Sequence, residues 1–99
     1  MQPEIWIGTV EISFTDADKP NDVKRAFTVV TTWASNFEEF NQKCVLMLES
    51  YGWKLLGVEA AIPLPQNAVF GDEVEDMLEQ TRVNEAAIIY GAFHTYYVM

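Results

Sequence analysis

The hydrophobic pattern of this chain changes its period at Ser35, and that change limits the folds that the chain can adopt. In IWIGTVEISF, residues 5–14, apolar residues stand at every second position, and AFTVVTTWA, residues 26–34, is rich in β-branched residues. Both patterns favour β-strands. After Ser35 the apolar residues recur with the helical period, at Phe37, Phe40, Cys44, Met47, Leu48 and Tyr51. The sequence therefore predicts two strands followed by an amphipathic helix.

Both ends of this helix carry sequence signals. Ser35 with Glu38, or Asn36 with Glu39 one residue later, has the spacing of a capping box. Gly52 can end the helix in the left-handed conformation that glycine tolerates. The connection between the two strands, TDADKPNDVKR at residues 15–25, is polar and contains a proline, which is typical of a loop.

The rest of the chain alternates strand and helix again. WKLLGVEAAI, residues 53–62, predicts a third strand, and AAIIYGAFHTYYV, residues 86–98, predicts a fourth. Between them, the loop at 63–71 leads into a helix at 72–82, where Asp72 can act as the cap and Glu75 can complete a capping box. Over 99 residues, the order ββαβαβ predicts a single α+β domain. We expect a two-layer sandwich: a four-stranded sheet with two helices on one face.

Two helices on one face leave the other face of the sheet uncovered. The third and fourth predicted strands are apolar or aromatic on both faces, and they include Trp53, Tyr90 and Tyr96. Soluble monomers usually avoid exposing a contiguous patch of this kind. A homodimer is the simplest remedy, because twofold dimers are the commonest oligomers. A partner protein or a small ligand held against Trp53, Tyr90, His94 and Tyr96 is the alternative.

Acidic residues outnumber basic ones fifteen to six, which gives a net charge of −9. A chain of this charge repels nucleic-acid phosphates and anionic membranes and attracts basic proteins. The charge is concentrated in the predicted second helix, which carries Asp72, Glu73, Glu75, Asp76 and Glu79. Such a run is either a solvated helix face or a surface that docks a basic partner. Small acidic inhibitors and immunity proteins use the second strategy.

Apolar residues beside this helix strengthen the docking interpretation. The loop at 63–71 offers Leu64, Val69 and Phe70, and an apolar anchor with an acidic rim suits a protein interface. Val69 and Phe70 could instead only staple the start of the helix. Leu46 is predicted to project from the polar side of the first helix, where it would add a further contact.

Catalytic and metal-binding patterns are mostly missing from the sequence. The segment TDADKPND begins like a calcium loop, but proline, asparagine and phenylalanine then replace its essential residues. One histidine and one cysteine do not make a zinc site without carboxylates, and no nucleotide-binding or hydrolase motif is present. We therefore expect no metal and no cofactor. Cys44 lies within an apolar stripe, where a thiol has little nucleophilic character.

Glu59 and His94 form the one remaining candidate pair. Glu59 is the only acid of the third predicted strand, and it would face His94 if the third and fourth strands paired. A carboxylate beside an imidazole can orient a general base. A single pair without a nucleophile, a metal or a phosphate loop is not a mechanism, however. This enzyme or ligand-binding alternative therefore stands second.

The leading prediction is an acidic, non-enzymatic interaction module that docks a basic protein, as an inhibitor or immunity protein does. The first residues, MQPEIWIGTV, carry no basic region and no long apolar stretch, and the chain has a single cysteine. We therefore expect a cytoplasmic protein.

Overall fold

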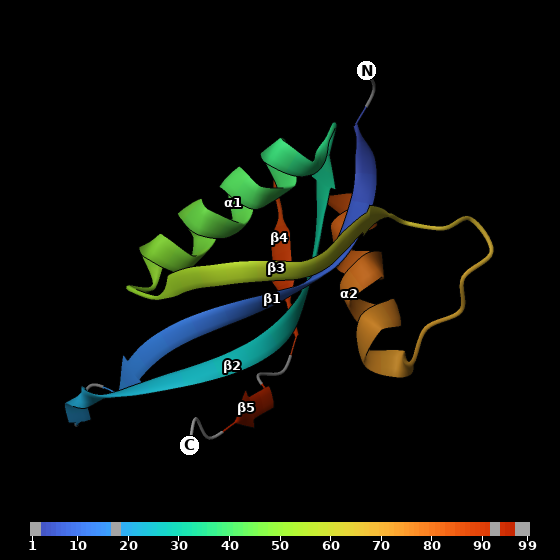
Figure 1. Cartoon of the computed structure of the whole chain (residues 1–99). Coiled ribbons are helices and arrows are strands. Elements are labelled where there is room, and N and C mark those ends of the chain that lie inside the picture. Colours follow the sequence, from blue (N-terminus) through green and yellow to red (C-terminus); the bar gives the residue numbers. More distant parts are fainter. Residues whose placement is uncertain (1–2, 17–18, 92–93, 97–99) are drawn as a thin grey trace.

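An antiparallel sheet of five strands, four strands wide, and two helices make up the fold (Figure 1). The computed structural model describes residues 3–16, 19–91 and 94–96, and the side chains of 3–14 and 24–91. The elements are β1 (Glu4–Asp16), β2 (Lys19–Ala34), α1 (Phe37–Ser50), β3 (Lys54–Pro63), α2 (Asp72–Val83), β4 (Ile88–Tyr90) and β5 (His94–Tyr96). The strands lie in the order β3-β1-β2-β4, and β5 also pairs with β2. The α+β class and the order ββαβαβ are confirmed.

The first two strands form a longer hairpin than the sequence predicts. Most of the predicted loop at 15–25 belongs to the strands, because the pairing of Ser13 with Arg25 continues to Thr15 with Val23. Asp16 then pairs with Lys19 after a shift in register. The connection itself, residues 17–18, lies outside the described residues. Pro20 is compatible with a strand here because the described partner of this end of β2 is β1 alone, and proline is tolerated at sheet edges.

The predicted last strand is divided into β4 and β5, which pair with separate parts of β2. The backbone at Gly91 still donates a hydrogen bond to the carbonyl oxygen of Val29, at 2.9 Å. A Cβ atom at Gly91 would lie 2.8 Å from Oε1 of Glu73 and 3.2 Å from the sulfur of Met77, so side chains of α2 pack closely against the chain here. β4 and β5 together stand where the last strand was predicted, with an interruption at Gly91, and residues 92–93 lie outside the described residues.

Helix α1 begins one residue later than the first of its two predicted capping boxes. Asn36 is the N-cap, and its side-chain oxygen accepts a hydrogen bond from the backbone N–H of Glu39 at 2.9 Å. The carboxylate of Glu39 accepts a bond from the backbone N–H of Ser35 at 3.3 Å. At the other end Gly52 has φ 76°, the left-handed conformation expected from the sequence. The cap thus uses Asn36 with Glu39 rather than Ser35 with Glu38.

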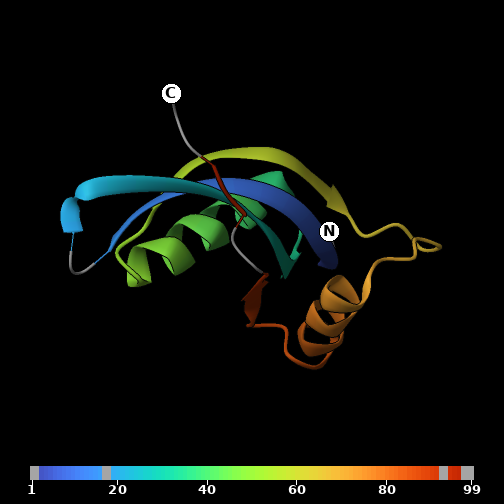
Figure 2. The ribbon, with the colours of Figure 1, turned by 90° about the horizontal axis from the view of Figure 1, so that it is seen from below.

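The core lies between α1 and the concave face of the sheet (Figure 2). Four residues of the predicted stripe are buried there, namely Phe40, Cys44, Met47 and Leu48. They contact the side chains of β1 and β2 that point toward the helix, including Val10, Ile12, Ala26, Val30 and Ala34. Phe37, at the start of the same stripe, is 47% exposed. The sheet therefore covers the middle of the helix stripe and leaves its first residue in solvent.

Helix α2 does not share this face, which corrects the expectation of two helices on one side. Side chains alternate along β2, so Thr31 and Trp33 point away from the face on which Val30 and Ala34 meet α1. The hydroxyl oxygens of Thr31 and Thr81 lie 2.7 Å apart, and Nε1 of Trp33 donates to the carbonyl oxygen of Thr81 at 2.7 Å. In Figure 2 the end of β2 turns down between the two helices. Helix α2 thus covers one end of the face that was expected to stay open.

Candidate protein-docking site

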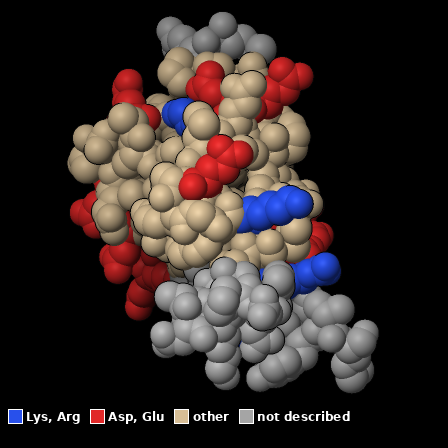
Figure 3. Space-filling view, turned by 90° about the vertical axis from the view of Figure 1, so that its left-hand side faces the viewer, with Lys and Arg blue, Asp and Glu red and all other residues tan. Residues whose placement is uncertain are grey.

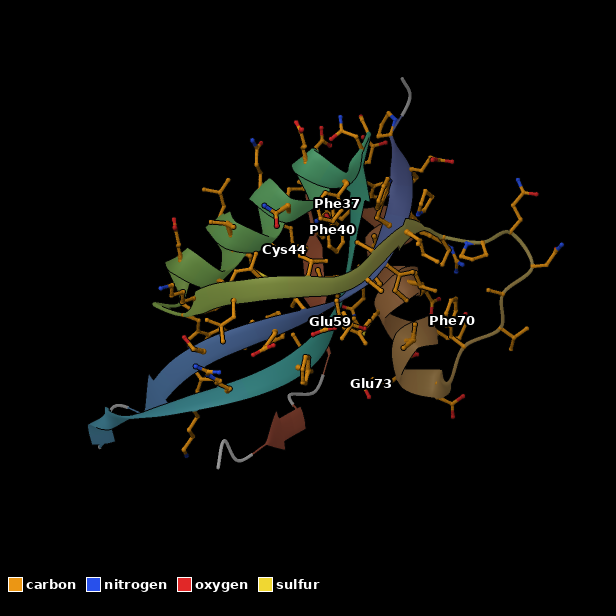
Figure 4. All side chains as sticks on the ribbon, in the orientation of Figure 1. Phe37, Phe40, Cys44, Glu59, Phe70 and Glu73 are labelled. Atoms are coloured by element: carbon orange, nitrogen blue, oxygen red, sulfur yellow. The ribbon has the colours of Figure 1, made fainter. Side chains whose placement is uncertain are left out.

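The loop before α2 is fastened to the start of the helix. The N-cap is Gly71, and no side chain caps the helix, so the prediction that Asp72 is the cap was wrong. Glu75 does reach back, but its Oε1 accepts a bond from the backbone N–H of Phe70 at 3.3 Å. This bond draws Phe70 against the first turn of α2, where Figure 4 shows its side chain beside the helix. Phe70 therefore packs against the start of α2, as a staple would, and this position does not prevent it from also contacting a partner.

Three carboxylates form a row on the solvent side of α2. Met77, Leu78 and Thr81 are buried, and Asp72, Asp76 and Glu79 lie on the opposite side of the helix and are exposed. We call these three residues the acidic ridge. Glu73 projects toward Gly91 and Glu75 toward the preceding loop, so the five predicted acids do not form one surface. Three acids in successive turns give a local negative potential at this end of the molecule.

A groove lies beside the acidic ridge, between the loop at 64–70 and α2. Its volume is about 280 Å³. The apolar lining comes from four parts of the chain: Ile5, Trp33, Leu64, Pro65, Ala68, Phe70 and Leu78. Glu4, Gln66, Glu75 and Arg82 complete it. We call this the loop groove. It joins an apolar interior to charged groups, which is the composition of an interface pocket.

The loop residues proposed from the sequence take different positions. Leu64 and Phe70 line the loop groove, and Leu64 is fixed by a hydrogen bond from its backbone N–H to the carbonyl oxygen of Ile5 at 2.8 Å. Val69 is 92% exposed and does not line the groove. Trp33 and Arg82 do line it, although the sequence did not single them out. The sequence contains one signal for Trp33: it lies in a strand with apolar residues on both faces, which indicates that both faces pack against other elements.

Leu46 lies away from the groove and the acidic ridge. It is 66% exposed on α1, and α1 and α2 lie on different sides of the sheet end (Figures 1 and 2). The structure therefore does not bring Leu46 into one surface with α2.

Trp53 and Tyr90 contact each other, but on the concave side of the sheet. Tyr90 pairs with Val30, whose side chain is in the core, and its ring centroid is 6.0 Å from that of Trp53. Tyr51 stacks on Trp53 at 4.7 Å. Burial, followed by the hydrogen bond and charge interaction with Tyr51, raises the pKa of Tyr90 above its ordinary value. These aromatic rings join the two edges of the curved sheet instead of lining its open face. The side chains of His94 and Tyr96 lie outside the described residues.

Glu59 and His94 lie on strands that do not pair. β1 and β2 stand between β3 and β5, and adjacent strands are separated by roughly 4.8 Å, so the two backbones are about 14 Å apart. Glu59 is exposed at a register shift between β1 and β3. It lies over the sheet in Figure 4. The direct strand pairing that would bring Glu59 to His94 is not formed.

Cys44 is fully buried in the core, and Figure 4 shows it pointing from α1 toward the sheet. Burial raises the pKa of its thiol from 9.0 to about 12. A thiol that keeps its proton at neutral pH is a poor nucleophile. The side chain therefore acts as a small apolar group of the core.

The raised pKa of Cys44 predicts a loss of stability in alkali. The stabilising contribution is fully present below pH 9 and is lost as the pH rises toward about 12, because the unfolded chain releases the thiol proton first. We expect this group to lower the free energy of unfolding by up to about 1.4 kcal/mol per pH unit in that range. Urea unfolding of the chain and of Cys44→Ala at several pH values measures it. Since lysines and tyrosines titrate in both proteins, the difference between the two curves isolates Cys44. Parallel curves would contradict the prediction.

The described residues contain neither a membrane-spanning helix nor a cluster of metal ligands. No helix there is long and apolar enough to cross a membrane. No three histidine, cysteine or carboxylate side chains in that part of the chain come together as metal ligands. Comparison of the chain with protein-family models, with curated proteins and with solved structures finds no match.

Proposed function

We propose that the protein is a cytoplasmic, non-enzymatic interaction module that docks a basic protein partner through α2, in the manner of a small inhibitor or immunity protein. The acidic ridge carries this proposal, because Asp72, Asp76 and Glu79 present three exposed carboxylates from one helix face. In a chain of net charge −9 this ridge steers basic surfaces toward α2. The neighbouring loop groove supplies apolar surface for a stable contact.

Charge alone does not identify α2 as the docking surface. Figure 3 shows Asp and Glu side chains spread over the opposite side of the molecule as well, among a few Lys and Arg. A basic protein could be held by the total charge of the chain instead of by one helix. The test must therefore compare charge reversals at two different positions that change the net charge by the same amount.

Reversing the charge of the ridge should abolish partner capture. The immobilised chain is expected to retain a basic protein from its host lysate at low salt and to release it at high salt, since screening weakens exposed charge pairs. The double variant Asp76→Lys/Glu79→Lys should retain little of it while remaining folded. Mass spectrometry identifies the captured protein, and titration calorimetry with that purified protein measures the loss of affinity.

The matched control is Glu38→Lys/Glu49→Lys on α1, which changes the net charge by the same amount. Both residues are exposed on a helix on the other side of the sheet end. This control is expected to weaken capture only slightly. Equal losses in the two double variants would mean that net charge, and not α2, holds the partner. Unchanged capture by the α2 variant would refute the proposal.

We further propose that copies of the chain self-associate through the face of β3 that points away from α1. In support, Leu56 and Ile62 are 39% and 51% exposed, on the face that α2 leaves uncovered. Sedimentation velocity at rising concentration tests it, with Ile62→Asp expected to shift the protein to monomer. A wild-type chain that stays monomeric at high concentration would exclude this association.

A further inference from the structure

The loop groove has the size and lining of a pocket for one side chain of a partner. We propose that it receives a large apolar side chain of the basic partner, adjacent in the partner's sequence to a lysine or arginine. This inference rests on the proposed function, whose partner it describes more closely. The inference is based on three properties of the groove: an apolar interior, nearby acidic residues and a limited volume.

The volume is sufficient for one large side chain of a partner. The groove measures about 280 Å³, just below the range of roughly 300–1,000 Å³ that is typical of small-molecule sites. One leucine or aromatic side chain fills a space of this order. Anchors of that kind, set in desolvated pockets, supply most of the affinity of protein interfaces.

The polar groups of the groove suit a peptide segment with a positive charge. In the described part of the chain, neither the carboxylate of Glu4 nor the guanidinium of Arg82 takes part in a hydrogen bond or an ion pair. The guanidinium of Arg82 can donate to main-chain carbonyl oxygens, which any peptide provides. The carboxylate of Glu4 can accept from a lysine or arginine of the partner, and the acidic ridge on the same helix as Arg82 adds to that attraction.

The walls of the groove are held in place before a partner arrives. The backbone of Phe70 is bonded to Glu75, and that of Leu64 to Ile5. Trp33 is fixed through its Nε1, which donates to Thr81. A preformed pocket avoids the entropic cost of ordering these groups on binding. The groove is therefore built to accept a side chain without rearrangement.

Selection from a library of short linear peptides displayed on phage, with the intact chain as the target, tests this inference. We expect the enriched peptides to combine a large apolar residue with an adjacent lysine or arginine. A synthetic copy of the best peptide is then titrated into protein labelled with 5-fluorotryptophan and followed by ¹⁹F NMR. The resonance of Trp33, assigned with Trp33→Phe, should shift. Those of Trp6 and Trp53, which pack on the concave side, should not.

Two neighbouring loop residues provide matched variants for the peptide. Phe70→Ala, which removes a groove wall, should weaken binding about tenfold or more. Val69→Ala, which changes a side chain outside the groove, should leave binding unchanged. Circular dichroism and thermal unfolding verify that both variants are folded. If Phe70→Ala does not fold, Leu64→Ala replaces it as the groove variant.

The outcomes separate this inference from the proposed function. Peptides that are basic but lack an apolar requirement, and that leave Trp33 unshifted, would overturn the groove while supporting docking on the acidic ridge. Peptides that bind the groove regardless of charge and are unaffected by Asp76→Lys/Glu79→Lys would overturn the basic partner and the proposed function with it. No enrichment at all would overturn the groove inference directly, and the lysate capture would still decide the proposed function.

Discussion

Replacing Phe40 with alanine is expected to lower the free energy of unfolding by about 3–5 kcal/mol. Phe40 is completely buried between α1 and the sheet, and its ring lies 6.2 Å from that of Trp6. The substitution removes the apolar contacts of a whole ring and leaves a cavity that the surrounding sheet can fill only in part. Since small domains have a total stability of about 5–15 kcal/mol, this loss is a large share. Urea unfolding followed by circular dichroism measures it.

Phe37 provides the control from the same helix. It is the same residue type one turn earlier, but it is 47% exposed, so Phe37→Ala should cost much less than Phe40→Ala. If Phe40→Ala does not fold at all, Phe40→Leu, which keeps most of the apolar volume, should lower the free energy of unfolding by about 1 kcal/mol. Equal effects of the two alanine substitutions would mean that the core is not centred on Phe40.

The helical period of α1 predicted which side of the helix is buried, but not how far along the helix the burial extends. Phe40, Cys44, Met47 and Leu48 are buried as expected, whereas Phe37 at one end of the stripe is half exposed. Periodicity is a property of one helix. The length of the stripe that is covered depends on the width of the sheet above it, which depends on how four strands pair.

The position of α2 could not be predicted from its own apolar stripe. Met77, Leu78 and Thr81 lie on one side of α2 and are buried. Either face of the sheet could have received them, however. The deciding contacts come from Thr31 and Trp33 in β2. Because side chains alternate along a strand, these two point away from the face that packs against α1, and both form hydrogen bonds with Thr81. A strand such as β2, with buried side chains on both faces, signals a second layer.

The candidate site could be predicted from the sequence only where it lies within one helix. The acids of α2 are close together in the sequence, so the helical period alone was enough to place Asp76 and Glu79 on a common solvent side. The loop groove is made from residues of β1, β2, the loop and α2, which are far apart in the sequence. Only the tertiary structure brings Ile5 and Trp33 to Phe70.

Gly8→Ala is expected to destabilise the protein by about 1–3 kcal/mol, although its local effect on a strand should be favourable. Glycine in a strand interior is normally the worse residue, because it loses more conformational freedom on folding than alanine does. At Gly8 an added Cβ would lie 2.7 Å from the carbonyl oxygen of Ala60 and 2.8 Å from Cζ of Phe40. The backbone oxygen belongs to the neighbouring strand and cannot turn aside. Steric strain therefore outweighs the gain in chain entropy.

Gly57 is the control, because a Cβ atom there would meet nothing within 4 Å. Gly57→Ala should leave the free energy of unfolding unchanged or raise it by up to about 1 kcal/mol. A double variant distinguishes the two contacts at Gly8. The loss in Gly8→Ala/Phe40→Leu should be smaller than the sum of the losses in the two single variants. Gly8→Ala should still destabilise the Phe40→Leu protein, because the contact with Ala60 remains. If Gly8→Ala instead stabilises the protein as Gly57→Ala does, then Gly8 is not in close contact with Ala60 of β3 and with Phe40.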